Sequence, residues 1–195
     1  MMKEIFDFQV GRLLIIVVLS FITLNSISTT ISSENIIFRH LLPWTGTWLI
    51  FVATADIKLY NVVKSNIGLS RPYWYFIAAI FGILAQPTYL SKSIFSAEFS
   101  EFFIAALVSM AVAFSEELTF RGLAYSTIKS NTILKIAFSA VIFSAAHGLS
   151  LRLTYLVFVF VVGILIGALR SSSKSILPGV LAHFIHNLGA YIITP

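Results

Sequence analysis

The sequence SEELTFR, residues 115–121, lies in the middle of a long apolar segment and carries Glu116, Glu117 and Arg121. An ionisable side chain deep in an apolar span costs about 2.5–3.5 kcal/mol on insertion scales, so three of them so close together need a reason. One explanation is a buried ion pair that joins two helices. The other is a catalytic site inside a membrane.

The composition is that of a membrane protein. Of the 195 residues, 58% are hydrophobic and only 11% are charged, and the mean hydropathy is +0.94. Soluble domains are about 25% charged. The absence of cysteine excludes disulfides, thiolate metal sites and a cysteine nucleophile. The net charge of +5 comes from basic residues scattered singly between apolar stretches, so nucleic acid is not expected as a partner.

Seven apolar stretches are each close to the ~20 residues that cross ~30 Å of hydrocarbon. We therefore expect an all-α, polytopic helical bundle of about seven transmembrane helices in the cell membrane. The second stretch is short, so whether it crosses the whole bilayer stays open. The fourth is long enough to extend beyond the bilayer. The polar segment 170–175 (RSSSKS) predicts a loop. The stretches are 10–28, 42–57, 73–90, 99–128, 133–149, 153–169 and 176–193.

The distribution of basic residues predicts the orientation. With seven crossings, ten Lys and Arg residues fall on one side and three on the other, which places the N-terminus in the cytoplasm. The first stretch has Lys3 and Arg12 before its apolar run, as in a signal peptide, but no small-residue cleavage site follows it. It is therefore expected to be a retained helix.

Glu116 and His147 are predicted to lie at the same depth. The fourth and fifth stretches are joined by a polar turn at Ser130, Asn131 and Thr132. Glu116 and His147 are equally far from the centre of this turn, about 15 residues or ~23 Å at ~1.5 Å per residue. In an antiparallel hairpin the carboxylate therefore faces the imidazole.

Three further pairs at i, i+4 share helix faces. Phe143 and His147 form one such pair, which puts an aromatic ring beside the imidazole. Glu117 and Arg121 form the second and are expected to be an ion pair. Glu116 points about 100° away from Glu117, so its carboxylate is expected to contact other residues than Arg121.

The third pair, His183 and Asn187, lies in the last stretch at a comparable depth. His186 lies about 60° round the same helix from His183, so a role for it is less expected. A single membrane histidine is more often a packed helix contact than a catalyst. The coincidence of depth and face for Glu116, His147, His183 and Asn187 together favours catalysis.

Three segments resemble the motifs of the CPBP intramembrane protease family: EELTFR at 116–121, FSAAH at 143–147 and HFIHN at 183–187. The family groups CAAX prenyl endopeptidases of the Rce1 type with bacteriocin-processing and immunity (Abi) proteins. Its patterns E-E-x-x-x-R, F-x-x-x-H and H-x-x-x-N occur here in order. The resemblance implies variable N-terminal transmembrane helices over 1–98 and a catalytic core over 99–195.

The resemblance also implies roles for individual residues. Glu116 is the expected general base, and His147 helps to hold the water that it activates. His183 and Asn187 are the expected donors to the oxyanion of the tetrahedral intermediate. The resulting catalytic set is Glu116, His147, His183 and Asn187, with Glu117, Arg121 and Phe143 as supporting residues.

The need for a metal stays open at this point. Glu116, His147 and His183 would also be a reasonable set of zinc ligands, and such a site would polarise the scissile carbonyl. No H-E-x-x-H motif is present, and the three ligands would come from three helices. Zinc is the one cofactor under consideration.

The sequence predicts an intramembrane endopeptidase that cleaves a membrane-associated protein or peptide by glutamate-activated water. Bacteriocin self-immunity, peptide maturation and signalling are all compatible with it, and the oligomeric state and cleavage site are open. The alternative is a non-catalytic membrane scaffold or immunity protein that binds a toxin or a sensor kinase. A proton-coupled transporter is disfavoured because no inverted repeat is visible.

Overall fold

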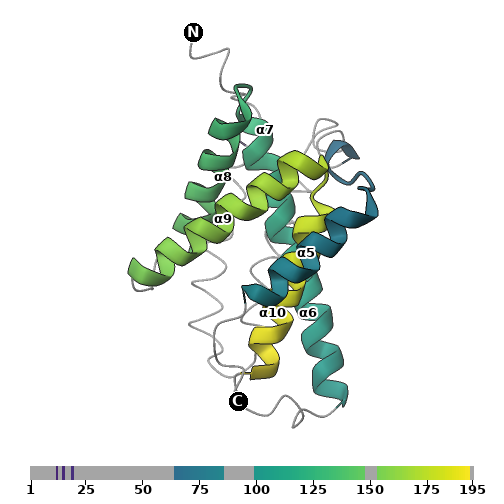
Figure 1. Ribbon diagram of the computed structural model, residues 1–195. Helices are drawn as coiled ribbons and strands as arrows, with labels where there is room; N and C mark the ends of the chain where they lie inside the picture. Colours follow the sequence, from purple (N-terminus) through teal and green to yellow (C-terminus); the bar gives the residue numbers. More distant parts are fainter. Residues whose placement is uncertain are drawn as a thin grey trace.

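The computed structural model describes residues 64–85, 99–147 and 153–193, together with the helical positions Arg12, Ile15 and Leu19; residues 99–101 and 190–193 are described by their backbone alone. This part of the chain is helical and contains no strand, so the all-α prediction is confirmed for it. The elements are α5 (Pro72–Leu84), α6 (Phe99–Glu117), the π-helix η1 (Leu118–Ala124), α7 (Tyr125–Thr127), α8 (Thr132–His147), α9 (Leu153–Ser173) and α10 (Leu177–Ile193) (Figure 1).

Five of the seven predicted stretches coincide with these helices. Within the described ranges, two helices are long and apolar enough to cross a membrane, Phe102–Thr127 and Leu153–Ser173, and α5 and α8 are shorter apolar helices. The stretches 10–28 and 42–57 lie outside the described residues, apart from the three isolated positions. The count of seven spans and the cytoplasmic N-terminus therefore stay predictions.

The fourth stretch forms one continuous helical rod from α6 through η1 to α7. Its middle section, Leu118–Ala124, is a π-helix in which all seven residues are buried. The wider π turn changes the direction of the side chains that follow it. Ser139 of α8 stabilises this section, because its hydroxyl donates a 2.8 Å hydrogen bond to the Phe120 carbonyl. Sequence patterns gave no indication of this π-helix.

Close contact between α8 and α9 depends on two glycines of α9. A Cβ atom on Gly163 would lie 3.1 Å from Cα of Ala140, and one on Gly167 would lie 3.1 Å from Cγ2 of Ile136. The small-xxx-small spacing of these glycines predicts such an approach, and the structure confirms it. Figure 1 shows α9 crossing α8 obliquely.

The last helix, α10, packs against α5, α6 and α9 and so holds the bundle together. Pro178 is its second residue, where a missing N–H removes no helical hydrogen bond. The contact with α5 is especially tight at Gly82, where an added Cβ would lie 2.6 Å from the Ala182 carbonyl oxygen. α5 therefore belongs to the packed core with the helices of the C-terminal half.

The loop predicted for 170–175 is wrong over most of its length. α9 continues through Ser173, and the chain turns only at Lys174, whose φ is 58°. Residues ahead of α5 stabilise this last turn: the Ser70 hydroxyl donates to the Ser173 carbonyl (2.7 Å), and Arg170 donates to the Asn66 side chain. These tertiary hydrogen bonds outweigh the weak helix propensity of three successive serines.

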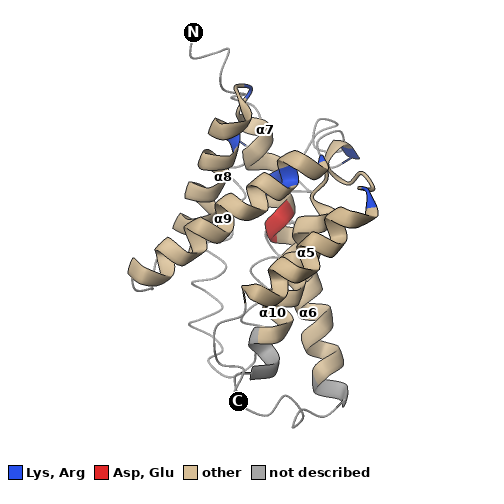
Figure 2. Cartoon of the chain, viewed as in Figure 1, with Lys and Arg blue, Asp and Glu red and all other residues tan. Residues whose placement is uncertain are grey.

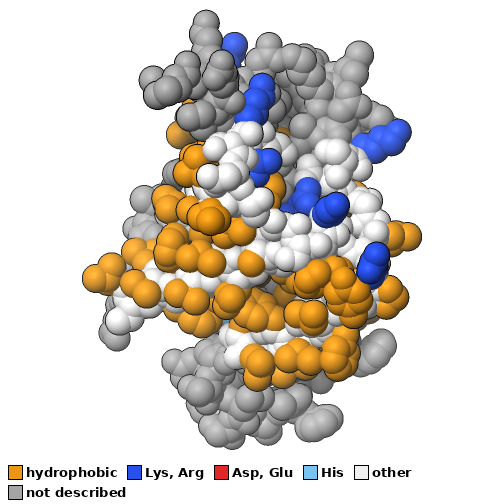
Figure 3. All heavy atoms as spheres, turned by 45° about the horizontal axis from the view of Figure 1, so that its top comes forward, with side chains coloured by type: hydrophobic (Ala, Val, Ile, Leu, Met, Phe, Trp, Pro, Cys, Tyr) orange, Lys and Arg blue, Asp and Glu red, His pale blue; other side chains and the backbone are white. Residues whose placement is uncertain are grey.

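The surface separates into an apolar band and a basic end. Large hydrophobic side chains are strongly exposed on several helices, among them Phe76, Leu84, Leu107 and Leu153. Figure 3 shows these apolar groups as a broad band with Lys and Arg beside it at one end. Such a band, together with the two long apolar helices, supports a membrane location.

Arg121 does not belong with the basic groups of that end, although the orientation count included it there. Its side chain is completely buried. Figure 2 shows the acidic residues inside the bundle, and among the side chains that the structure describes these are Glu116 and Glu117 alone. The interior of the helical domain thus contains a compact group of charged residues.

Candidate active site

The two glutamates lie at the junction between α6 and the π-helix. Glu116 and Glu117 are the last residues of α6, with only 6% and 0% of their surfaces exposed. Adjacent positions on a helix point about 100° apart, so the two carboxylates meet different partners. Glu117 faces Arg121, whereas Glu116 faces α8 and α10.

Glu117 and Arg121 form a fully buried ion pair. Arg121 Nη1 donates to Glu117 Oε1 over 2.9 Å, and Nη2 donates to the Gly163 carbonyl over 3.3 Å. The guanidinium carbon also lies 4.2 Å from the centroid of the Phe143 ring. The pair predicted from the i, i+4 spacing is therefore present, and it connects η1 to α8 and α9.

Glu116 contacts imidazoles from two other helices. Its Oε2 atom lies 3.7 Å from Nε2 of His147 on α8 and 3.4 Å from Nε2 of His183 on α10. The predicted meeting of Glu116 and His147 is thus observed. These separations are longer than strong direct hydrogen bonds and correspond to electrostatic contacts. Three segments far apart in the sequence converge on one carboxylate oxygen.

The other nitrogen of each imidazole has an acceptor of its own. Nδ1 of His147 lies 2.8 Å from the Phe143 carbonyl, and Nδ1 of His183 lies 3.3 Å from Glu117 Oε1. A carbonyl and a carboxylate can only accept, so each Nδ1 carries a hydrogen and donates it. The Nε2 atoms are left to face Glu116, where they accept a proton or share one with it.

Phe143 packs against most of the group. Its ring centroid lies 4.5 Å from that of His147 and 5.9 Å from that of His183. Phe120 of the π-helix contacts the same ring edge-on at 5.2 Å. Together with its contact to Arg121, this makes Phe143 the apolar support that fixes both imidazoles.

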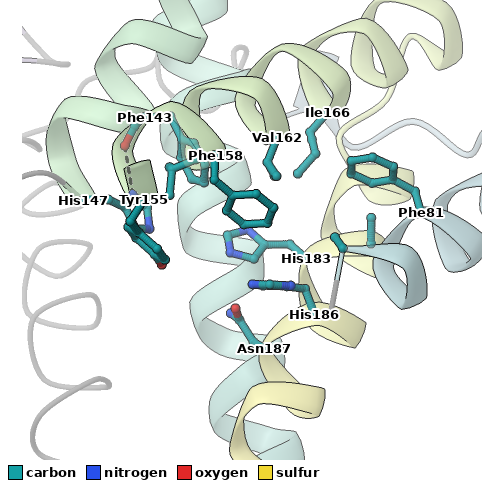
Figure 4. A pocket seen from close by; sticks show the side chains of 13 residues that line it. Phe81, Phe143, His147, Tyr155, Phe158, Val162, Ile166, His183, His186 and Asn187 are labelled. Atoms are coloured by element: carbon teal, nitrogen blue, oxygen red, sulfur yellow. Dashed lines mark hydrogen bonds between the residues drawn. The ribbon is translucent and has the colours of Figure 1, made fainter. Parts of the chain in front are cut away.

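A cavity of about 70 Å³ borders the two imidazoles (Figure 4). This volume is several times the roughly 10–15 Å³ that one water molecule needs. Polar groups from α8 and α10 form one side, and mainly apolar groups from α5 and α9 form the other. Asn187 lies on the polar side, as its spacing from His183 predicts. The lining residues are Phe81, Ala85, Phe143, His147, Tyr155, Phe158, Val159, Val162, Ile166, Ala182, His183, His186 and Asn187.

Several of these residues were not predicted. His186 lines the cavity next to His183, although its position on the helix made a role less expected. Tyr155 and Phe158 come from α9, and Phe81 comes from α5, helices that carry no motif. A tyrosine inside an otherwise apolar stretch was the one available signal for Tyr155. The cavity also takes residues from both sides of the predicted domain boundary at 98, and that boundary stays a prediction.

The zinc hypothesis stays a prediction. Two imidazoles and a carboxylate are suitable zinc ligands. However, among the residues that the structure describes, no three His, Asp or Glu side chains are arranged so that they could hold a metal ion.

The fold and the site define a class: an apolar helical domain in which two imidazoles and an amide line a small cavity and a buried carboxylate contacts both imidazoles. The comparison with family models is more specific. Residues 98–189, just under half of the chain, match the family described as Type II CAAX prenyl endopeptidase Rce1-like. The resemblance expected from the three motifs is confirmed, and all seven predicted site residues lie inside the matched segment. No curated protein and no solved structure matches the chain.

This match indicates peptidase activity and a membrane location. The family is one of CAAX-type intramembrane proteases, which agrees with the two long apolar helices. A peptide substrate follows from the same match.

Proposed function

We propose that the protein is an intramembrane endopeptidase in which Glu116 activates water for attack on a peptide bond. The observation that carries the proposal is the position of Glu116 Oε2, 3.4 and 3.7 Å from two imidazole nitrogens that border the cavity. Amide hydrolysis needs a base next to the attacking water and donors near the developing oxyanion. This site offers both kinds of group within a buried, apolar surrounding.

The proposed steps assign a role to each of the four residues. Glu116 removes a proton from water, and His147 orients that water from the α8 side. The resulting hydroxide adds to the scissile carbonyl. His183, protonated on Nε2 as well as on Nδ1, and Asn187 donate hydrogen bonds to the oxyanion from the α10 side of the cavity. The proton taken up by Glu116 then passes to the leaving amine as the C–N bond breaks.

Glu117 and Arg121 are proposed to position these groups. Arg121 compensates the charge of Glu117, and Glu117 in turn holds Nδ1 of His183. His183 is thereby fixed with Nε2 toward Glu116. Arrangements of this kind, in which a second carboxylate orients the imidazole that contacts the reaction, recur in hydrolases.

The proposed substrate is a peptide segment of a membrane-associated protein or peptide. The apolar surroundings of the site favour a substrate that reaches it from within the bilayer. The prenyl group in the family's description is not part of this proposal, because no feature of the described residues requires it. Bacteriocin self-immunity and peptide maturation are two biological settings that such an activity fits.

The experiment compares the wild-type protein with Glu116→Gln and His147→Ala in proteoliposomes that contain a panel of fluorescence-quenched apolar peptides. We expect Glu116→Gln to abolish cleavage and His147→Ala to reduce it about 10²–10⁴-fold, the usual contribution of acid–base groups. His40→Ala, outside the three motifs, is the matched control and should be fully active. Full cleavage by both site variants would contradict this mechanism, and no cleavage by the wild-type protein would favour the non-catalytic scaffold instead.

A further inference from the structure

Tyr155 is the one lining residue of α9 that carries a hydrogen-bonding group. The other four that α9 contributes are Phe158, Val159, Val162 and Ile166. The Tyr155 hydroxyl is the one side-chain group of this wall that can donate or accept a hydrogen bond with a bound substrate. Within the described part of the chain the Tyr155 hydroxyl forms no hydrogen bond, and the ring is positioned by Phe158, 6.3 Å away between centroids.

The position of Tyr155 is that of a group at the mouth of the cavity. The residue is 42% exposed, whereas His183 deeper in the cavity is 7% exposed. Figure 4 shows the Tyr155 ring beside His147, across the cavity from His183 and Asn187. A peptide bond held between these two sides would present its carbonyl oxygen to α10 and its nitrogen to Tyr155.

We propose that Tyr155 is a further catalytic residue, whose hydroxyl forms a hydrogen bond with the nitrogen of the scissile peptide bond. This inference rests on the proposed peptidase function. In the planar amide the phenol oxygen accepts from the N–H group. In the tetrahedral intermediate the lone pair of the nitrogen is no longer delocalised and accepts the proton from Glu116, so the N–H group gains positive charge and its hydrogen bond to the phenol oxygen becomes stronger.

The hydroxyl transfers no proton in this scheme. The proton that leaves with the amine is the one that Glu116 takes from water, and Tyr155 only stabilises the pyramidal nitrogen. Because this hydrogen bond is stronger in the transition state than in the bound substrate, its loss lowers kcat more than it raises KM.

The test measures kcat and KM of Tyr155→Phe with one internally quenched peptide that the wild-type protein cleaves. The substitution removes a single oxygen atom and preserves the ring, so the unfolding temperature should not change. We expect kcat to fall about ten- to a hundredfold, and KM to stay within about twofold, as for loss of one transition-state hydrogen bond. Tyr73→Phe on α5 is the matched control, since Tyr73 is 48% exposed and does not line the cavity.

Each other outcome overturns the inference. Unchanged kinetics of Tyr155→Phe, or a raised KM with an unchanged kcat, would exclude a transition-state role for the hydroxyl. The proposed peptidase function would still be supported if Glu116→Gln is inactive. An equal loss in Tyr73→Phe would reveal a general effect of removing a surface hydroxyl. If the wild-type protein cleaves no peptide of the panel, or if Glu116→Gln cleaves normally, the proposed function fails and this inference fails with it.

Discussion

His183 contacts Glu117 through Nδ1, which lies 3.3 Å from the carboxylate oxygen Oε1. The same oxygen accepts the 2.9 Å hydrogen bond from Arg121. A residue of the last helix is thus connected through one carboxylate to a cation of the π-helix. The ion pair and the imidazole form a single electrostatic unit rather than two separate contacts.

Removing the cation from this unit should destabilise the protein strongly. Arg121→Met leaves Glu117 buried without its counter-charge, and loss of one partner of a buried pair costs about 3–5 kcal/mol. The double variant Glu117→Gln, Arg121→Met removes both charges and should unfold at a higher temperature than Arg121→Met. Thermal unfolding in detergent micelles measures this difference. A single variant as stable as the wild-type protein would show that the pair contributes nothing.

Gly179 should be intolerant of even a methyl group. A Cβ at this position would lie 2.8 Å from Glu117 Oε2 and 3.0 Å from Ile166 Cγ2. Gly179→Ala therefore displaces the carboxylate, and overpacking of this kind typically costs about 1–3 kcal/mol. The control is Gly68→Ala, where no atom lies within 4 Å of the added Cβ. We expect the Gly179 variant alone to lose stability and peptidase activity, and equal behaviour of the two variants would contradict the tight fit.

Phe143→Leu should weaken both the fold and the site. It retains an apolar side chain but removes the ring that contacts Arg121 and the two imidazoles. Aromatic pairs contribute about 0.5–1.5 kcal/mol beyond the area they bury, so a loss of about 1–2 kcal/mol is expected. Cleavage should fall at least about tenfold because the imidazoles lose their orientation. Phe76→Leu, at a position 69% exposed, should match the wild-type protein in both assays.

Two asparagines should respond in opposite ways to replacement by alanine. Asn187 lines the cavity, so Asn187→Ala should lower kcat by about 10²–10³ and leave the unfolding temperature nearly unchanged. Asn66 is buried and accepts a hydrogen bond from Arg170, so Asn66→Ala should lose about 1–3 kcal/mol and retain kcat for the folded fraction. Circular dichroism melts and initial rates distinguish the two patterns. A stability loss without a rate loss in Asn187→Ala would assign that amide a packing role.

The sequence was most informative where a contact is set by helix geometry. Equal distance from the turn at Asn131 brought Glu116 opposite His147, and i, i+4 spacing paired Glu117 with Arg121. The lengths of the apolar stretches likewise located the helices, because a run of about 20 apolar residues is what a membrane-spanning helix requires. These relationships depend only on helical rise and repeat, which vary little between proteins.

The sequence was least informative where tertiary contacts decide the outcome. The π-helix after Glu117 depends on a hydrogen bond from Ser139 to a backbone carbonyl, and the extension of α9 depends on Asn66 and Ser70. Tyr155 reaches the cavity only because α9 crosses α8 at this angle. Such contacts join residues that are distant in the chain, and no local pattern records them.

The two glutamates acquire their partners at different stages of biosynthesis. Arg121 emerges from the ribosome within one helical turn of Glu117, so this carboxylate enters the membrane already neutralised. Glu116 meets an imidazole only after α8 has been made, and a second one only after α10 has been made. The final helix therefore completes the reactive centre as it docks, and a nascent chain that lacks it holds an incomplete one.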